Sequence, residues 1–206
     1  MIFTEQLQQL RGNVSLCCYL QSWKYFEGFE STIRQEYSFK NAVQIRAREE
    51  LQNCQRVYTE KFNASAMMVG VHIRRRDVAS NIAKSRGFAD APLVYIQKAM
   101  QFYEDRFQHV VFVLVSDDHS WCEKNFRQLL DRGQACLPPD RSAIQDLCVL
   151  SLCNNSIVTV GSFGWWSAFL AGGQVVYFDK WPRRDSEIAS HFNRADYFPP
   201  HWVGLS

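Results

Sequence analysis

Apolar positions in residues 66–206 alternate between short unbroken runs and runs with a period of three to four residues. The unbroken runs are rich in Val, Ile and Phe, which is typical of strands that are buried on both faces. Because strand and helix alternate, the pattern predicts an α/β fold with a Rossmann-like parallel sheet and helices on both faces. The predicted strands are residues 67–72, 109–115, 156–160 and 174–178.

Helices are predicted between these strands, because apolar positions there recur every three or four residues. Asp117 or Asp118 is expected to cap the helix that follows the second strand. Ser142 and Gln145 have the spacing of a capping box, which would start the next helix. The predicted helical ranges are 92–107, 142–153 and 164–171, together with the helix that follows residue 118.

The N-terminal third has a different pattern. Residues 42–62 predict one long helix, and residues 25–39 are expected to be helical without a clean apolar period. We therefore divide the chain into a helical N-terminal segment, residues 1–65, and a Rossmann-like domain, residues 66–206. The residues expected on the inner face of the long helix are Val43, Ala47, Leu51, Cys54 and Tyr58.

Composition narrows the class of protein. The chain has 206 residues, of which 47% are hydrophobic, so it is long and apolar enough for a folded core. Its 23 basic and 21 acidic residues give a net charge of +2, which argues against binding to nucleic acid or to an anionic membrane surface. No apolar run is long enough for a transmembrane helix, and the polar N-terminus has no signal peptide or anchor pattern.

Seven cysteines occur without a CxxC pair, which argues against a zinc or dithiol redox site. Cys148 and Cys153 lie in an apolar stretch and are expected to be packed thiols. Three N-x-S sequons, at Asn13, Asn63 and Asn154, are candidate glycosylation sites and favour a secretory compartment. In such a compartment a disulfide could form among Cys17, Cys18, Cys54, Cys122 and Cys136, and the sequence does not choose the pair.

Three polar clusters follow three of the predicted strands. They are residues 72–77, 116–119 and 161–166. Because ligands of open parallel sheets bind at the carboxyl ends of the strands, we expect these clusters to form one site.

The first cluster, His72-Ile-Arg-Arg-Arg-Asp77, brings three arginines to the end of a buried strand. Arginine has a planar fork that binds phosphate oxygens through two hydrogen bonds, so a pyrophosphate is one ligand that fits. The alternative is an arginine–carboxylate network at the edge of the sheet. Strand geometry places His72 and Arg74 on one side and Arg75 on the other.

The other two clusters each allow two interpretations. Gly161-Ser-Phe-Gly-Trp-Trp166 starts a helix, whose N-terminus could bind an anion, or it is a plain helix cap followed by core tryptophans. Ser116-Asp-Asp-His119 could hold Mn²⁺ or Mg²⁺, or it could cap a helix.

Together these motifs resemble the galactoside α1,2-L-fucosyltransferase family. Residues 72–77 look like the HxRRxD motif that α1,2- and α1,6-fucosyltransferases share. The resemblance extends over residues 15–206, and Tyr19 to Phe39 resembles the aromatic-rich helix before the nucleotide domain. Further matching segments are residues 115–122, 146–154, 162–173 and 198–204.

The resemblance implies an inverting glycosyltransferase of GT-B-like architecture, of which this chain holds the nucleotide-binding half. Such enzymes move L-fucose from GDP-β-L-fucose to the 2-hydroxyl of a terminal galactose on a glycan acceptor. They need no cofactor and no obligatory metal. They work in the Golgi lumen, attached to the membrane by an upstream anchor that this sequence lacks.

The resemblance also assigns residues. Asp77, His72 and Arg75 are the expected catalytic residues, with Asp77 as the base and Asp117 or Asp118 as the alternative base. Arg76 stands where the family usually has Gly, which adds bulk and charge beside the ligand. The expected donor-binding residues are His72, Arg74, Arg75, Asp146, Ser162, Phe163 and Gly164.

Two other functions compete with fucosyl transfer. A truncated domain that binds a GDP-sugar without turnover would use the same donor site. A metal-dependent glycosyltransferase would use Asp117, Asp118 and His119 as ligands.

Overall fold

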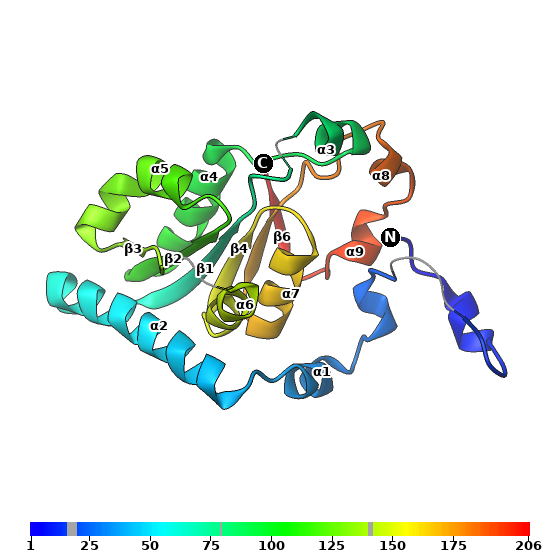
Figure 1. Ribbon diagram of the computed structural model, residues 1–206, viewed down its shortest axis with the longest axis horizontal. Helices are drawn as coiled ribbons and strands as arrows, with labels where there is room; N and C mark the ends of the chain where they lie inside the picture. The colour runs from blue at the N-terminus through cyan, green and yellow to red at the C-terminus, as the bar shows by residue number, and fades with distance from the viewer. Residues whose placement is uncertain (16–19, 79, 140–141) are drawn as a thin grey trace.

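One parallel sheet of six strands forms the centre of the molecule (Figure 1). The computed structural model describes residues 1–15, 20–78, 80–139 and 142–206. The strand order is β3-β2-β1-β4-β5-β6, and every neighbouring pair is parallel. The strands are β1 (Met67–Ile73), β2 (Val110–Ser116), β3 (Ala135–Cys136), β4 (Asn155–Val158), β5 (Val175–Phe178) and β6 (Val203–Leu205).

Helices cover both faces of the sheet, as the sequence predicts. Val71 and Leu114 belong to the core that contains the inner residues of α4 (Leu93–Glu104) and α5 (His119–Arg132). Val113 and Val115 pack instead with α2 (Asn41–Phe62) and α6 (Ala143–Ser151). The α/β, Rossmann-like prediction is confirmed. The remaining helices are η1 (Glu5–Gln9), η2 (Trp23–Tyr25), α1 (Glu30–Glu36), α3 (Asn81–Arg86), α7 (Ser162–Ala171), α8 (Glu187–Ser190) and α9 (Arg194–Tyr197).

Two buried tyrosines of α4 bond to the sheet across the core. Tyr95 donates its hydroxyl to the Val158 carbonyl at 2.7 Å, and Tyr103 donates to the Gln174 carbonyl at 2.7 Å. Buried hydroxyls are costly unless they have partners, so these bonds fix α4 against β4 and β5.

The ends of two helices test the predicted caps. Asp118 caps α5 by accepting the Trp121 N–H at 3.1 Å, as one of the two predictions has it. The capping box at the start of α6 is wrong, because the Ser142 side chain makes no cap bond. Gln145 donates to the Val43 carbonyl of α2 at 3.4 Å instead, so packing between the two helices takes the side chain away from the cap.

The long helix α2 packs as its apolar period predicts. Ala47, Leu51, Cys54 and Tyr58 are buried. The disulfide joins Cys54 to Cys136 and thus ties α2 to β3. Cys148 and Cys153 are buried free thiols as expected, and Cys122 is also free and buried, whereas Cys17 and Cys18 lie outside the described residues.

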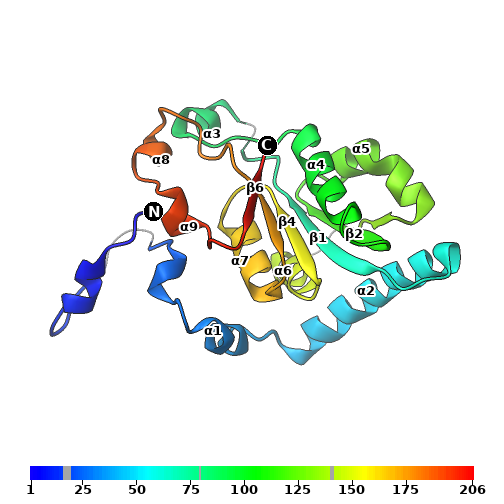
Figure 2. The same ribbon diagram turned by 180° about the vertical axis from the view of Figure 1, so that it is seen from behind.

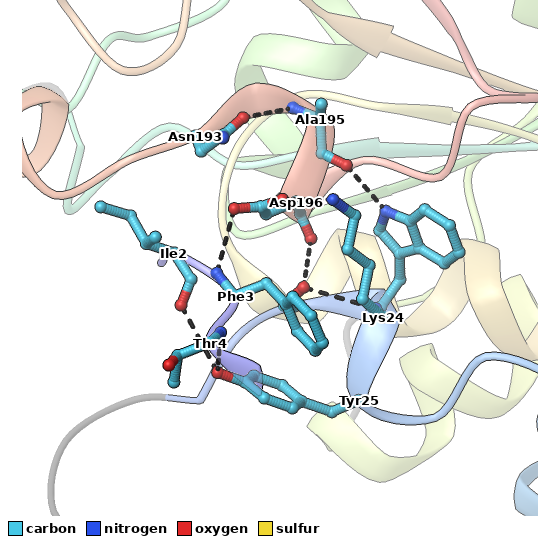
Figure 3. A network of polar contacts seen from close by, with 10 residues as sticks. Ile2, Phe3, Thr4, Lys24, Tyr25, Asn193, Ala195 and Asp196 are labelled. Atoms are coloured by element: carbon cyan, nitrogen blue, oxygen red, sulfur yellow. Dashed lines mark hydrogen bonds and ion pairs between the residues drawn. The ribbon is translucent and has the colours of Figure 1, made fainter. Parts of the chain in front are cut away.

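The N-terminal segment runs around the edge of the molecule from α9 toward α2, and it is seen from behind in Figure 2. Asp196 of α9 anchors its first part (Figure 3). The Asp196 carboxylate accepts from Lys24 Nζ at 2.6 Å and from the Phe3 N–H at 3.0 Å. Burial raises the pKa of Asp196, but these two hydrogen bonds outweigh burial and hold the pKa below its usual value.

No helix in the described ranges is long and apolar enough to cross a lipid bilayer.

Candidate functional site

The strand order reverses between β1 and β4, because the chain moves outward from β1 to β3 and then returns to the other side of β1. Open parallel sheets bind ligands outside the carboxyl ends of the strands at such a switch point. A cleft of about 430 Å³ lies at the ends of β1 and β2. Its lining comprises His72, Ile73, Arg74, Arg76, Asp77, Val115, Ser116, Asp117, His119, Ala143, Asp146 and Phe163.

His72 forms the buried end of this cleft. Its ring lies 5.5 Å from the Phe163 ring, and its Nδ1 has no hydrogen-bond partner among the described residues. Burial, and then the charge of Arg74, lowers the pKa of His72 to about 4. The imidazole is therefore neutral at pH 7.

Arg74 and Asp77 form a forked ion pair. Arg74 Nε donates to Asp77 Oδ1 at 2.9 Å and to Oδ2 at 3.1 Å, and Arg74 Nη2 also bonds Oδ2. These hydrogen bonds hold the pKa of Asp77 below its usual value. The backbone of Arg74 is fixed as well, because its N–H donates to Thr159 Oγ1 at 3.1 Å. In the ligand-free chain, Arg74 and Asp77 thus form the arginine–carboxylate contact that the sequence offers as the alternative to a pyrophosphate site.

Gly161 lets Arg74 approach the start of α7. A Cβ on Gly161 would lie 2.2 Å from Arg74 Nη1, and the φ of Gly161 is +92°, which L side chains rarely adopt. Nη1 is the guanidinium nitrogen that does not bond Asp77. This nitrogen lies beside the N-terminus of α7, a helix of ten residues. The guanidinium charge and the positive end of the helix dipole can therefore attract the same anion.

Arg75 points elsewhere. Its guanidinium lies 4.2 Å from the centre of the Trp121 ring on α5, a cation–π contact. Among the described residues that line the cleft, Arg74 and Arg76 are present and Arg75 is not. Arg74 and Arg75 therefore point in different directions, as the alternation of side chains along a strand predicts. Arg75 is expected to bind the donor, but its side chain does not line the cleft.

Asp117 holds the loop that carries the arginines. Its carboxylate accepts the backbone N–H of Arg75 at 2.8 Å and of Arg76 at 2.9 Å. Asp118 is occupied as the cap of α5, and His119 lines the cleft. In the part of the chain that the structure describes, no three His, Cys, Asp or Glu side chains are grouped so that they could hold a metal ion.

The remaining predicted donor-binding residues lie around this site. Asp146, in the first turn of α6, and Phe163 line the cleft. Gly164 packs directly on His72. Ser162 begins α7 but lines a second cleft, which shares Arg74 with the first. Trp165 is buried in the core, as predicted by the interpretation of residues 161–166 as a helix cap followed by core tryptophans.

The three sequons differ in their surroundings. Asn13 and Asn63 are exposed, and Asn63 ends α2 with a φ of +50°. Asn154 is also exposed, but its Oδ1 accepts the Met68 N–H at 3.0 Å. The sequon residue Ser156 is buried in β4, so the folded chain presents only the first two sequons as open sites.

Sequence patterns do not identify Thr159 as a site residue. Thr159 lies in a predicted strand, and only the pairing of β1 with β4 brings its hydroxyl to the Arg74 backbone.

A family model and curated proteins each match almost the whole chain. A family model described as "Glycosyl transferase family 11" matches residues 2–206. "Galactoside 2-alpha-L-fucosyltransferase SEC1" of Bos taurus is 31% identical over 98% of this chain and 54% of that protein. "Galactoside alpha-(1,2)-fucosyltransferase 2" of Bos taurus is 31% identical over 98% of this chain and 58% of that protein. The chain thus spans about half the length of the curated relatives it matches.

A solved structure is also similar. It is "Thermosulfurimonas dismutans KpsC, beta Kdo 2,7 transferase", with 16% identity and a TM-score of 0.35 over 88% of this chain and 55% of that one.

Proposed function

Because the chain belongs to glycosyl transferase family 11, we propose that it transfers L-fucose from GDP-β-L-fucose to the 2-hydroxyl of a terminal galactose. The relatives described above are named as galactoside α1,2-fucosyltransferases, which supports this reaction. The observation that carries the proposal is the cleft at the switch point of the sheet. It joins an arginine fork, a neutral buried imidazole and a helix N-terminus.

In this proposal the pyrophosphate of the donor contacts Arg74, and the guanosine and the fucose extend from it in different directions. The guanosine occupies the cleft beside Asp146, Phe163 and the imidazole of His72. The pyrophosphate lies on Arg74 and the N-terminus of α7, near Gly161 and Ser162. Arg76 lines the same cleft and adds a second positive charge, while Arg75 supports the loop through Trp121.

The proposed reaction exchanges one C–O bond at fucose C1 for another and moves one proton. The bond from fucose C1 to the β-phosphate oxygen breaks, and its electron pair leaves with GDP. The galactose O2 attacks C1 from the opposite face, so the configuration inverts, and the hydroxyl proton passes to a base. Arg74 and the helix N-terminus stabilise the charge that develops on the leaving phosphate.

We propose Asp77 as the base, and we propose that binding of the donor releases it from its ion pair with Arg74. In the ligand-free chain its carboxylate is paired with Arg74, which lowers its pKa and makes it a weak base. A pyrophosphate competes with Asp77 for the same guanidinium. When Arg74 turns to the phosphates, Asp77 loses its ion-pair partner, and its basicity rises. Asp117 is a weaker candidate, because backbone N–H groups occupy both of its oxygens.

The proposal assigns charge stabilisation to Arg74 and α7, with no cofactor and no obligatory metal. We also propose that residues 66–206 form the donor-binding domain and that the protein works in the Golgi lumen. The Cys54–Cys136 disulfide supports an oxidising compartment, since such bonds are rare in reducing ones.

Fucosyl transfer tests the proposal. The purified chain is incubated with GDP-fucose and N-acetyllactosamine, and the product is identified by mass spectrometry and by NMR of the linkage. We expect an α1,2-linked fucose, loss of product in Arg74→Ala, and wild-type activity in Arg127→Ala, an exposed arginine of α5 outside the site. The same assay with EDTA examines the metal-dependent alternative, which requires that the chelator stop the reaction.

A second candidate function is binding of a GDP-sugar without turnover. It is favoured by one observation, that Arg74 already pairs with Asp77, the proposed base. GDP binding without product, in a folded chain, would select this candidate and reject transfer.

A further inference from the structure

A second cleft, of about 790 Å³, adjoins the first one. Arg74, Gly161 and Ser162 form its border with the proposed pyrophosphate site. Another part of the lining comes from α9 and from the segment between β5 and α9, and it includes Trp181, Glu187, His191 and Tyr197. Because Arg74 lines both clefts, a pyrophosphate bound there would have the nucleoside on one side and its sugar on the other.

Trp181 supplies an unusual group to this part of the lining. Its side chain is only 4% exposed, and its indole N–H has no hydrogen-bond acceptor in the described part of the chain. The ring packs between Phe192 and Tyr197, with centroid distances of 5.1 and 5.2 Å. A buried donor without an acceptor costs free energy, so a small outward turn of the ring that brings this N–H to an acceptor oxygen of a ligand would be stabilising.

The rest of the lining suits a neutral ligand that carries many hydroxyls. Glu187 is exposed and can accept from hydroxyl groups, while Arg74 and Arg86 can donate to them. His191 Nδ1 lies 2.8 Å from Ser190 Oγ and 3.3 Å from the Glu187 carbonyl, which leaves Nε2 for another partner. Trp181, Tyr197 and Phe88 add aromatic surface to the lining.

The Asp196 network fixes the position of this part of the lining. Asp196 precedes Tyr197 in α9, and its contacts with Lys24 and Phe3 hold the N-terminal segment beside the cleft (Figure 3). The Asp196 carbonyl also accepts from Ser22 Oγ at 2.7 Å. These bonds make the cleft a preformed feature of the fold, as saccharide and other small-molecule sites usually are.

We propose that this second cleft binds the galactose-terminated acceptor, and that the Trp181 indole N–H donates to one of its hydroxyls. The inference rests on the proposed fucosyl transfer, because the donor sugar must enter the cleft from Arg74. Trp181 and Glu187 are then acceptor-binding residues, and neither contacts the nucleotide.

The test compares Trp181→Phe, which keeps the ring and removes the N–H, with Trp202→Phe, a core tryptophan that is 7% exposed. In Trp181→Phe we expect the KM for N-acetyllactosamine to rise about tenfold, the loss of one hydrogen bond, while the KM for GDP-fucose stays within twofold. Trp202→Phe should change neither KM. Glu187→Gln, an exposed substitution that does not threaten folding, should raise the acceptor KM alone.

Binding of the acceptor is measured separately by saturation-transfer NMR of N-acetyllactosamine with the GDP-bound chain. Binding that is lost in Trp181→Phe supports the cleft even if no fucose is transferred, in which case only the proposed function fails. Active transfer with an unchanged acceptor KM in Trp181→Phe and Glu187→Gln would overturn the cleft and leave the proposed function standing. A folded, GDP-bound chain that neither binds the disaccharide nor transfers fucose would overturn both.

Discussion

The imidazole of His72 fills the space in front of Gly164, and a Cβ placed on Gly164 would lie 2.4 Å from His72 Nδ1. Both residues are buried, one at the end of β1 and the other in the first turn of α7. The contact joins two strand–helix units that are far apart in sequence. It also places the neutral imidazole beside the N-terminus of α7, next to the proposed phosphate site.

Gly164→Ala should destabilise the fold, because the ring of His72 is buried and cannot move away freely. We expect a loss of about 1–3 kcal/mol in the free energy of unfolding, the usual cost of overpacking a core. Urea denaturation measures it, and a double-mutant cycle with His72→Ala provides the control. If Gly164→Ala costs as much in the His72→Ala background as in the wild type, the two residues are not coupled.

His72 should make the stability of the chain depend on pH between about 4 and 6.5. Its pKa is about 4 in the folded chain against an ordinary 6.5, so the unfolded chain binds more protons within this window. Stability therefore falls with acidification, by about 3 kcal/mol from pH 7 to pH 4 for this group, and is unaffected above the window. Urea denaturation at pH 4, 5, 6 and 7 should show the loss in the wild type and a smaller one in His72→Gln. Parallel curves for the two proteins would contradict the prediction.

Asp117→Ala should weaken GDP binding about tenfold, or about 1.4 kcal/mol, because the arginine loop loses the carboxylate that holds two of its N–H groups. Asp117→Asn keeps one oxygen acceptor and should give a smaller effect. Calorimetric titration measures both. An Asp117→Ala variant with normal GDP affinity, no transfer and a wild type that requires Mn²⁺ would instead identify Asp117 as a metal ligand.

Reduction of the Cys54–Cys136 disulfide should cost about 2–5 kcal/mol, because the bond closes a long loop across 82 residues of sequence. Urea denaturation with and without a phosphine reductant measures this difference. The Cys54→Ser, Cys136→Ser double variant should match the reduced wild type and not respond to the reductant. A wild type whose unfolding midpoint is unchanged by reduction would show that the bond adds nothing to stability.

Sequence patterns predict the fold well where elements are long and buried. The runs at β1 and β2, and the period of α2, give the elements almost to their ends. β3 and β6 have two and three residues, too few for a period, and pairing with β2 and β5 alone makes them strands. The family is likewise evident from the motifs, and the match over residues 2–206 confirms it.

The site is predictable as a location but not in its contacts. The clusters after β1 and β2 do meet in one cleft, because parallel strands end at the same edge. The partners of individual charges depend on loops: Arg75 turns to Trp121, and Asp117 bonds the backbone of the arginine loop. Trp181 has no sequence signal at all, because only the packed core shows that its indole N–H lacks an acceptor among the described residues.

Calorimetric titration with GDP, and with GMP for comparison, examines whether Arg74 holds the pyrophosphate. We expect the wild type and Arg75→Ala to bind GDP with similar affinity and to bind GMP more weakly, because Arg74 holds the pyrophosphate. Arg74→Ala, folded as judged by its thermal unfolding, should lose at least tenfold in GDP affinity. Equal affinity for GDP and GMP, or an Arg74→Ala variant that binds GDP like the wild type, would contradict the account.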